Sequence, residues 1–235
     1  MINGKKVGAV IPAAGRGSRM GGVTSKQFLE LAASPILLHT LRRFERAAIV
    51  DVIVVAAAPD LLPSVTLLIR KDGLKKIVRT IEGGDKRQDS VWNALGALAE
   101  HQVDIVAVHD GVRPFVSEKQ VTDVIRTAVQ ERAALLAVRS KETVKIVDDR
   151  RTVRSTPDRN EVWIAQTPQA FDMRLLVDAY ESAMSARFYG TDEAGLVERI
   201  GEKVSVVEGS YDNIKITTPE DLELAKIIAN RWNFD

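Results

Sequence analysis

The chain has 235 residues, of which 45% are apolar and 28% are charged, and its formal net charge is +1. This composition is typical of a soluble globular protein, and the near-neutral charge excludes a chain that recruits nucleic acid or an acidic membrane through its overall field. Cysteine is absent, which excludes disulfides, thiolate metal sites and a cysteine nucleophile. The polar N-terminus and short apolar runs predict neither a signal peptide nor a membrane span, so we expect a cytoplasmic enzyme without nucleic-acid or membrane partners.

The first predicted element is a strand at residues 7–13, a short continuous apolar run that indicates burial on both faces. It leads into a segment in which glycines are interleaved with basic residues: Gly15, Arg16, Gly17, Arg19, Gly21, Gly22 and Lys26. Glycines let the backbone approach a ligand closely, exposed N–H groups bind anions, and Arg and Lys neutralise them. The segment therefore predicts a phosphate-binding loop.

The rest of the chain alternates between apolar runs and segments with helical spacing. Further strands are predicted at residues 51–57, 76–81, 104–108, 133–138 and 204–208, with an extended segment at 213–217. Helices are predicted at residues 35–47, 61–71, 89–100, 118–131, 175–184, 193–200 and 219–230. Capping signals precede the helices that begin at residues 118 and 219. This alternation predicts an α/β fold with helices on both faces of a mostly parallel sheet.

Two short alternating segments, at residues 143–147 and 151–154, interrupt this pattern. They predict a β-hairpin that projects from the body of the protein. The pattern fits two interpretations equally, a surface ribbon and a dimerisation arm. The sequence has no evident linker or repeat, so we expect one domain over residues 1–235, with residues 139–158 as the arm.

Ligands of open α/β sheets bind beyond the carboxyl ends of the strands. Besides the first loop, the segments expected there carry Gly83, Gly84, Asp85, Arg87, Ser90, Asp110, Arg113 and Lys215. This set is rich in groups that donate hydrogen bonds to phosphate and contains carboxylates suited to a divalent ion, but it has no evident Ser–His pair. His109 is interpreted as a strand-end histidine that bonds locally rather than as a general base.

The first loop matches neither common nucleotide fingerprint. It lacks the G-x-x-x-x-G-K-[ST] string of a Walker A loop, and Gly21 comes one residue late for a dinucleotide-binding G-x-G-x-x-G. The second predicted strand also ends without the acidic residue that binds a ribose. A nucleoside triphosphate suits this basic loop better than a dinucleotide does, because its negative charge is larger.

Motifs along nearly the whole chain occur in the order of one enzyme family: PAAGRGSRM with Lys26-Gln27, GGDKRQDSV, HDGVRP, DRN…QTPQAF, TDE and DNIKITTPEDL. The chain resembles the 2-C-methyl-D-erythritol 4-phosphate cytidylyltransferase family over residues 7–225. The resemblance implies a three-layer, Rossmann-like nucleotidyltransferase fold with a projecting β-hairpin arm. It also implies that a sugar-alcohol phosphate reacts with CTP, with Mg²⁺ as cofactor, to give a CDP-alcohol and pyrophosphate in non-mevalonate isoprenoid biosynthesis. D-Ribitol 5-phosphate cytidylyltransferase is the alternative.

The resemblance also implies a role for each site residue. The catalytic residues would be Arg19, Lys26, Arg159 and Lys215, the first two stabilising the transition state and the last two positioning the acceptor phosphate. The nucleotide would be bound by Ala13, Ala14, Gly15, Gly17, Gly84, Asp85 and Ser90. The acceptor would be bound by Asp110, Arg113, Thr143, Thr167 and Thr191, with Asp110 also a candidate metal ligand.

In this family the arm crosses between the subunits of a homodimer, so Thr143 and Arg159 would serve the neighbouring subunit's site. The chain departs from the family pattern within the arm. Arg139 stands where the family usually has proline, and Glu142 where it has aspartate. We expect the loss of the proline to loosen the entry to the arm.

Overall fold

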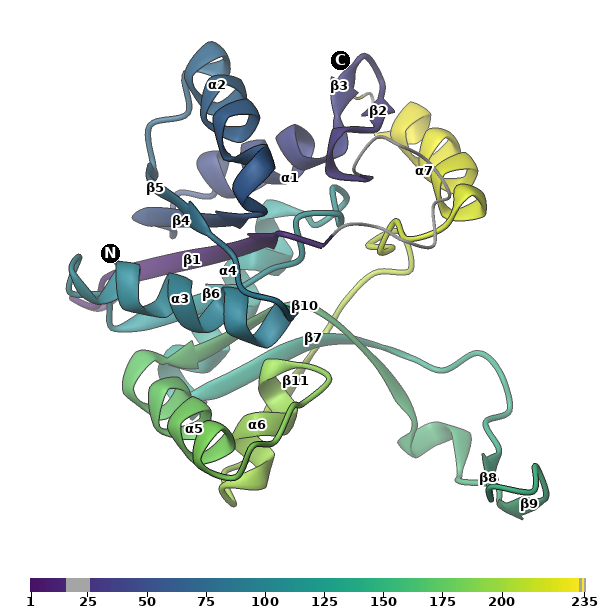
Figure 1. The fold of residues 1–235 in the computed structure, drawn as a ribbon. Helices are drawn as coiled ribbons and strands as arrows, with labels where there is room; N and C mark the ends of the chain where they lie inside the picture. Colours follow the sequence, from purple (N-terminus) through teal and green to yellow (C-terminus); the bar gives the residue numbers. More distant parts are fainter. Residues whose placement is uncertain (16–25, 233, 235) are drawn as a thin grey trace.

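A seven-stranded sheet in the order β11-β7-β10-β6-β1-β4-β5 is the centre of the structure, a computed structural model that describes residues 1–15, 26–232 and 234 (Figure 1). The strands are β1 (Val7–Ala13), β4 (Val52–Ala57), β5 (Ile77–Glu82), β6 (Ile105–Val108), β7 (Ala133–Arg139), β10 (Trp163–Asp172) and β11 (Ser205–Glu208). Neighbouring strands are parallel except at β10, which runs antiparallel to both β6 and β7. The prediction of a mostly parallel sheet is confirmed.

Helices cover both faces of this sheet, which confirms the predicted three layers. One face carries α1 (Ile36–Arg46), α2 (Leu62–Asp72) and α4 (Glu118–Glu131), and the other carries α3 (Arg87–Ala99), α5 (Met173–Ser185) and α6 (Glu193–Arg199). Successive side chains of β1 point to opposite faces of the sheet, where two apolar clusters lie. Val7 and Ile11 belong to the first cluster, on the side of α1, and Val10 belongs to the second, on the side of α3. This two-sided burial explains why β1 is a continuous apolar run.

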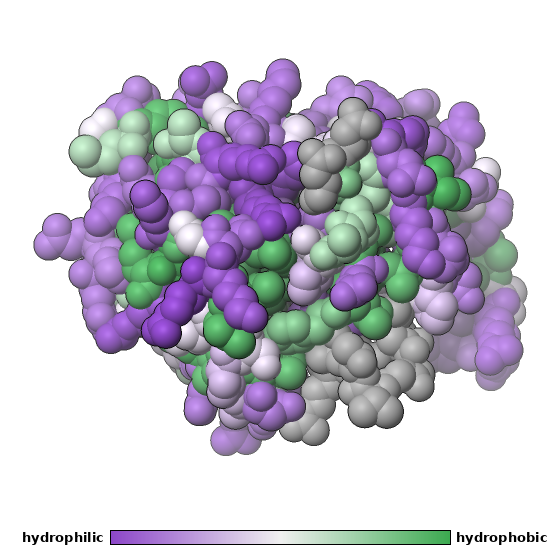
Figure 2. Space-filling view, turned by 90° about the horizontal axis from the view of Figure 1, so that it is seen from above, coloured by the Kyte–Doolittle hydropathy of each residue, from purple (hydrophilic) through white to green (hydrophobic). Residues whose placement is uncertain are grey.

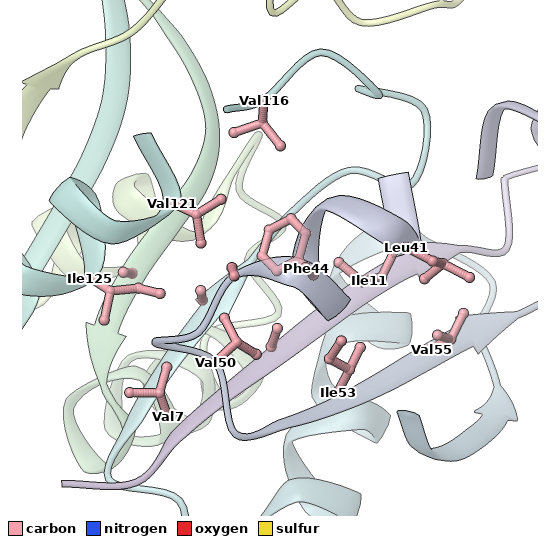
Figure 3. Close-up of a cluster of buried hydrophobic side chains, with 14 of the residues drawn as sticks. Val7, Ile11, Leu41, Phe44, Val50, Ile53, Val55, Val116, Val121 and Ile125 are labelled. Atoms are coloured by element: carbon pink, nitrogen blue, oxygen red, sulfur yellow. The ribbon is translucent and has the colours of Figure 1, made fainter. Parts of the chain in front are cut away.

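The aromatic ring of Phe44 lies in the middle of the first cluster (Figure 3). It is fully buried, and its neighbours in the cluster come from β1, β4 and α4 as well as from α1. A ring enclosed from several elements contributes a large apolar area to the core and fixes how α1 sits on the sheet. The N-terminal end of α1 is thereby held above the carboxyl edge of β1.

The last helix, α7 (Pro219–Arg231), lies beyond the carboxyl end of β1 and packs on a small hairpin of β2 (Glu30–Leu31) and β3 (Ser34–Pro35). A third apolar cluster joins them and includes Leu31, Phe115, Ile216 and Ile228. Short 3₁₀ helices occur at Lys26–Phe28, Pro59–Leu61 and Arg159–Glu161. Residues 213–217 form no strand, although Ile216 N–H donates to the Val112 carbonyl at 3.0 Å.

The capping signals act as the sequence indicates. Ser117 accepts a hydrogen bond from Gln120 N–H, and the Gln120 side chain accepts one from Ser117 N–H at the start of α4. Thr218 and Asp221 make the same reciprocal pair before α7, with Pro219 in the first turn. The helix starts at Glu118 and Pro219 agree with the prediction because these side chains satisfy backbone N–H groups locally.

The predicted hairpin projects from the body, with β8 (Ile146–Val147) antiparallel to β9 (Val153–Ser155) (Figure 1). Its apolar side chains are about half exposed: Ile146, Val147 and Val153. The base of the arm is tied across, because the Arg139 guanidinium donates to the Asn160 carbonyl at 3.3 Å and stacks on Trp163. Arg139 therefore fastens the entry to the arm that it was expected to loosen.

The strand β10 was not predicted, and the sheet order depends on it. Its sequence, WIAQTPQAFD, contains a proline and several polar residues instead of an apolar run. Its pairing with β7 shifts register between Ala165 and Gln169, where the Thr167–Pro168 peptide bond is cis. Because the sequence of β10 has neither an apolar run nor a regular alternation, periodicity does not predict the strand. Its place in the sheet follows from its pairing with β6 and β7.

Viewed from above, hydrophilic side chains in purple cover much of the surface, with smaller green patches between them (Figure 2). Within the described ranges, no helix is long and apolar enough to cross a bilayer. The predicted phosphate loop between Gly15 and Lys26 lies outside the described residues.

Replacing Phe44 by alanine tests the core around α1. The fully buried ring leaves a cavity, so we expect Phe44→Ala to lower the free energy of unfolding by about 3–5 kcal/mol in urea denaturation. Leu224→Ala on the exposed face of α7 is the control, with a change within about 0.5 kcal/mol. Equal losses in the two variants would contradict the assignment of Phe44 to the core.

Candidate active site

Two adjoining pockets open at the carboxyl edge of the sheet and share Arg87, Asp110 and Lys215. The first, here called the glycine-lined pocket, is formed with Ala13, Ala14, Gly15, Lys26, Gly84, Asp85 and Ser90. The second, the β10 pocket, is formed with Arg113, Gln166, Thr167, Gln169, Thr191 and Asp192. Segments distant in sequence thus form one site with two compartments.

Close backbone packing shapes the wall of the glycine-lined pocket. A Cβ atom on Gly83 would lie 2.4 Å from Ala14 Cβ, and one on Gly84 would lie 2.3 Å from Asp89 Cβ, so neither position accepts a side chain. The Ser90 hydroxyl accepts a hydrogen bond from Gly84 N–H and donates to the Lys86 carbonyl, both at 3.1 Å. Ser90 therefore holds the turn in which the two glycines lie.

Gln27 ties together the two described flanks of the predicted phosphate loop. Its side-chain amide, almost fully buried, donates to the Ala13 carbonyl and to the Gly15 carbonyl, the latter at 2.8 Å. Lys26, the preceding residue, lines the pocket. Lys26 is thereby brought to the end of β1, as expected for a residue that meets phosphate.

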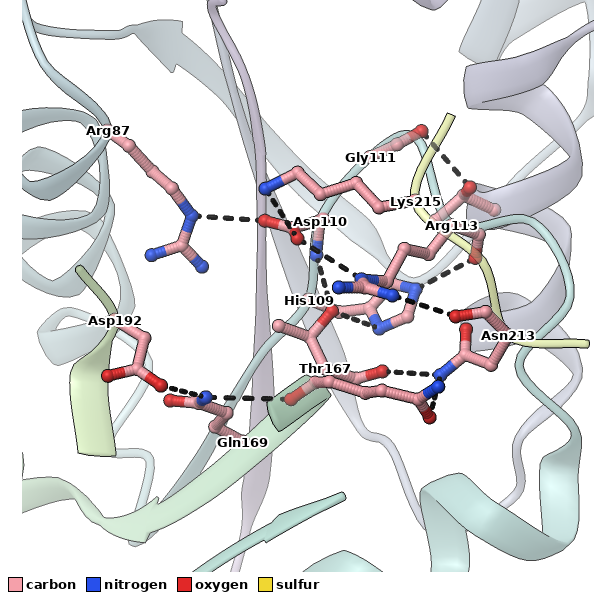
Figure 4. Close-up of polar contacts among 12 residues, drawn as sticks. Arg87, His109, Asp110, Gly111, Arg113, Thr167, Gln169, Asp192, Asn213 and Lys215 are labelled. Atoms are coloured by element: carbon pink, nitrogen blue, oxygen red, sulfur yellow. Dashed lines mark hydrogen bonds and ion pairs between the residues drawn. The ribbon is translucent and has the colours of Figure 1, made fainter. Parts of the chain in front are cut away.

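The Asp110 carboxylate is the electrostatic centre of the site (Figure 4). Oδ1 lies 3.0 Å from Arg87 Nε, while Oδ2 lies 3.3 Å from Arg113 Nε and 3.0 Å from Lys215 Nζ. Burial acts to raise the pKa of Asp110, but attraction to Arg87, Lys215 and Arg113 outweighs it and holds the pKa well below its usual range. Asp110 is therefore ionised at neutral pH.

Arg87 bridges Asp110 to a second buried carboxylate. Its Nη1 lies 2.6 Å from Oε1 of Glu193, which is 1% exposed and also accepts a hydrogen bond from the Tyr180 hydroxyl at 3.1 Å. Burial acts to lower the pKa of Arg87, and the charges of Glu193 and Asp110 raise it overall. Two carboxylates thus hold the Arg87 guanidinium at the boundary of the two pockets.

His109 is a structural residue whose protonation state follows from its partners. Its Nε2 faces the Arg113 carbonyl at 3.0 Å, which can only accept, so Nε2 carries the proton. Nδ1 then accepts from the Thr167 hydroxyl at 3.1 Å, while that oxygen accepts from Asp110 N–H at 3.0 Å. Complete burial lowers the pKa of His109 to about 4, so the imidazole is neutral at pH 7. The interpretation of a locally bonded histidine is confirmed.

Hydrogen bonds to backbone carbonyls fix the side chains of Arg113 and Asn213. Arg113 Nη1 donates to the Asn213 carbonyl at 2.7 Å, and Asn213 Nδ2 donates to the Thr167 carbonyl at 2.9 Å (Figure 4). These bonds tie the loop after β6 to β10 and to the segment that carries Lys215. The site is therefore held by hydrogen bonds between segments that no local sequence pattern connects.

Most of the site residues expected from the sequence line the two pockets: Ala13, Ala14, Gly15, Lys26, Gly84, Asp85, Ser90, Asp110, Arg113, Thr167, Thr191 and Lys215. Thr143 lies on the exposed arm and Arg159 is exposed directly after it, and neither residue lines either of the two pockets. Gly17 and Arg19 fall outside the described residues. Sequence reasoning missed the functions of Gln27 and Glu193, although both stand in the KQ and TDE motifs that carried the resemblance.

The fit of a divalent ion depends on Asp110. In the part of the chain that the structure describes, no group of three or more His, Asp and Glu side chains could hold a metal. The carboxylate of Asp110 faces both pockets but already contacts Arg87, Arg113 and Lys215. Mg²⁺ takes one or two carboxylates and completes its shell with phosphate oxygens and water, so an ion bound here would share the Asp110 carboxylate with these cations.

A mostly parallel sheet between two layers of helices, with a glycine-lined cationic pocket at the carboxyl edge of the sheet, defines an α/β nucleotidyltransferase-like protein. The chain belongs to the 2-C-methyl-D-erythritol 4-phosphate cytidylyltransferase family, whose sequence model matches residues 7–231. Two proteins of that name are similar along their length. The one from Bacillus cytotoxicus is 46% identical over 92% of this chain and 95% of its own, and the one from Geobacter metallireducens is 45% identical over 93% and 95%.

Solved structures agree with the family assignment. The 4-diphosphocytidyl-2C-methyl-D-erythritol synthase of Anaerococcus prevotii superposes with a TM-score of 0.87 at 36% identity, over 97% of this chain and all of its own. The 2-C-methyl-D-erythritol 4-phosphate cytidylyltransferase of Thermus thermophilus gives a TM-score of 0.78 at 32% identity, over 96% and 99%. The fold and the sequence therefore indicate the same family.

Burial of neutral His109 predicts a pH-dependent stability. The unfolded chain binds a proton near the ordinary pKa of 6.5 but the folded chain only near 4, so the unfolding free energy decreases as pH falls between these values. A shift of this size corresponds to about 3 kcal/mol. Urea denaturation between about pH 7 and about pH 4.5 should show a shallower decrease for His109→Gln than for the wild type. His101→Gln, after α3, is the control, and parallel curves for His109→Gln and the wild type would contradict the prediction.

Proposed function

We propose that the protein transfers the cytidylyl group of CTP to 2-C-methyl-D-erythritol 4-phosphate, releasing pyrophosphate and 4-diphosphocytidyl-2-C-methyl-D-erythritol for non-mevalonate isoprenoid biosynthesis. The observation that carries the proposal is the pair of adjoining pockets joined at Asp110 and Lys215, which gives separate places to two phosphorylated substrates. The family assignment supports this choice of substrates. None of the relatives named above is a ribitol phosphate enzyme, so that alternative is not favoured.

In this proposal the glycine-lined pocket binds CTP. The backbone at Ala13, Ala14 and Gly15 contacts the nucleotide, together with Gly17 beyond the described residues. Gly84, Asp85 and Ser90 contact the cytosine. A small slot at these residues would favour a pyrimidine, because a purine has a second ring to accommodate.

The β10 pocket then binds the acceptor. Asp110 and Thr191 offer polar groups to its hydroxyls, Thr167 forms part of the wall, and Arg113 and Lys215 offer cationic groups to its phosphate. Lys215 lies on the boundary with the glycine-lined pocket, where the two substrates meet. An acceptor seated there directs its phosphate toward the α-phosphate of CTP.

The chemistry requires no general base. A phosphate monoester is largely dianionic at pH 7, so its oxygen attacks the α-phosphorus directly, and the bond from that phosphorus to the pyrophosphate oxygen breaks. Buried, neutral His109 is bonded on both nitrogens and takes no proton. Catalysis comes from positioning and from cations that neutralise the negative charge, namely Lys26, Lys215, Arg19 and Arg159.

Mg²⁺ is proposed as the cofactor. Asp110 would be its protein ligand, and the triphosphate would supply the other oxygens. When bound, the ion neutralises phosphate charge and stabilises the charge that develops in transfer. The protein's own share is to hold Asp110 ionised and facing both pockets.

The arm supports a homodimer with shared sites. Its two-stranded hairpin has no core of its own, and its exposed apolar residues, Ile146, Val147 and Val153, need a partner to bury them. Thr143 lies on this projecting segment and Arg159 directly after it, and neither residue lines a pocket of its own chain. A second copy, with its arm at the first copy's β10 pocket, would complete both sites.

A cytoplasmic location without nucleic-acid or membrane partners also belongs to the proposal. It is supported by the ordinary composition and by the net charge of +1.

A substrate panel tests the reaction. We expect pyrophosphate release from CTP to require 2-C-methyl-D-erythritol 4-phosphate, to stop with EDTA and to return with excess Mg²⁺. UTP in place of CTP and D-ribitol 5-phosphate in place of the acceptor are the controls and should give little release, because each leaves polar groups of the site unpaired. Release driven better by ribitol phosphate would reject the proposed acceptor.

Mixed dimers test the shared site. Lys215→Ala inactivates a subunit's own pocket, and Arg159→Ala inactivates the arm that the subunit lends. Each variant alone should be inactive, while an equal mixture after random subunit exchange should recover about a quarter of wild-type activity, because about half of the dimers are then heterodimers and one of the two sites in each is intact. Pyrophosphate release measures the recovery. No recovery after confirmed subunit exchange would show that each site uses its own Arg159.

A further inference from the structure

The segment of residues 188–193 forms one wall of the β10 pocket and is held by contacts with α6, β10 and the start of α3. Thr191 and Asp192 line the pocket, and Gly190 sits so close to α6 that a Cβ atom there would lie 2.7 Å from Leu196 Cδ2. The side chain of Asp192 accepts from Gly195 N–H at 3.0 Å and from Gln169 Nε2 at 2.8 Å. The position after Thr191 is thus fixed from α6 and β10.

The position before Thr191 is fixed by Gln88, in the first turn of α3. The buried Gln88 amide donates through Nε2 to the Phe188 carbonyl at 3.1 Å and accepts from Gly190 N–H at 2.9 Å. One side-chain amide thus satisfies a backbone carbonyl and a backbone N–H two residues apart. Gln88 therefore fixes the backbone of residues 188–190 directly.

Contacts on either side of Gln88 join the same two segments. Lys86 Nζ lies 3.4 Å from the centroid of the Tyr189 ring, and Arg87 Nη1 lies 2.6 Å from Glu193 Oε1. Residues 86–88, which follow Gly83, Gly84 and Asp85 in the sequence, thus contact residues 188–193. The wall of the β10 pocket is built onto the first turn of α3.

We propose that Gln88 is a positioning residue for the acceptor: its amide fixes the backbone on which Thr191 stands, so that the Thr191 hydroxyl is presented to the acceptor. This inference rests on the proposed function. Gln88 lines neither the glycine-lined pocket nor the β10 pocket, so it acts through the segment and not by contact with a substrate. Its loss should therefore weaken use of the acceptor and leave use of CTP nearly unchanged.

Steady-state kinetics of Gln88→Met tests the inference, since methionine keeps the approximate volume and removes both hydrogen bonds. We expect the KM for 2-C-methyl-D-erythritol 4-phosphate to rise about tenfold and the KM for CTP to change less than about twofold. Gln88→Glu is the second variant; it still accepts from Gly190 N–H but sets a buried carboxylate oxygen against the Phe188 carbonyl, so the KM for 2-C-methyl-D-erythritol 4-phosphate should rise at least as much as in Gln88→Met. Asn93→Ala is the matched control, because Asn93 on the same helix donates to the Glu82 carbonyl and touches neither pocket.

The Thr191→Val background shows whether Gln88 acts through Thr191. If the hydroxyl of Thr191 is what Gln88 positions, the effect of Gln88→Met on the acceptor KM should be several-fold smaller in that background. Equal rises in both KM values, an unchanged acceptor KM, or effects that multiply fully in the double variant would each overturn the inference. Failure of the proposed function is distinct, because the wild-type enzyme itself would then show no turnover of this acceptor.

Discussion

The attraction between one buried carboxylate, Asp110, and the cations around it is the interaction on which the site depends. Arg87, Arg113 and Lys215 come from three different segments and would repel one another in a pocket that held no anion. Asp110 compensates that repulsion and gives each cation a fixed direction. The cost of burying such charges is recovered only while every partner is present, so the segments after β5, β6 and β11 are coupled to one another.

Local signals in the sequence predict the elements that position this cluster. Seven apolar residues in a row indicate β1, and side-chain caps at Ser117 and Thr218 mark where α4 and α7 begin. The carboxyl-edge rule then brings Gly84, Asp110 and the end of β1 together without knowledge of the full topology. These predictions succeed because each depends on neighbouring residues or on a general property of parallel sheets.

Other features depend on partners that are remote in the sequence, and they could not be predicted. Arg87 was expected to be a phosphate donor, but Glu193, more than a hundred residues later, helps hold it on Asp110. The strand β10 has no apolar alternation, and only pairing with β6 and β7 defines it. Arg139 was expected to loosen the entry to the arm because it replaces a proline. In the structure its guanidinium stacks on Trp163 and donates to the Asn160 carbonyl across the arm.

The insertion of β10 between β6 and β7 has a consequence for how the chain folds. β10 pairs with a strand that precedes it by roughly sixty residues, and it separates two strands that are consecutive in sequence within the body. The part of the sheet around β1 can form from contacts within the first half of the chain, but β7 must wait for β10 before it joins. We therefore expect slow completion of the sheet, with the β1 side of the site organised before the β10 pocket during synthesis of the chain.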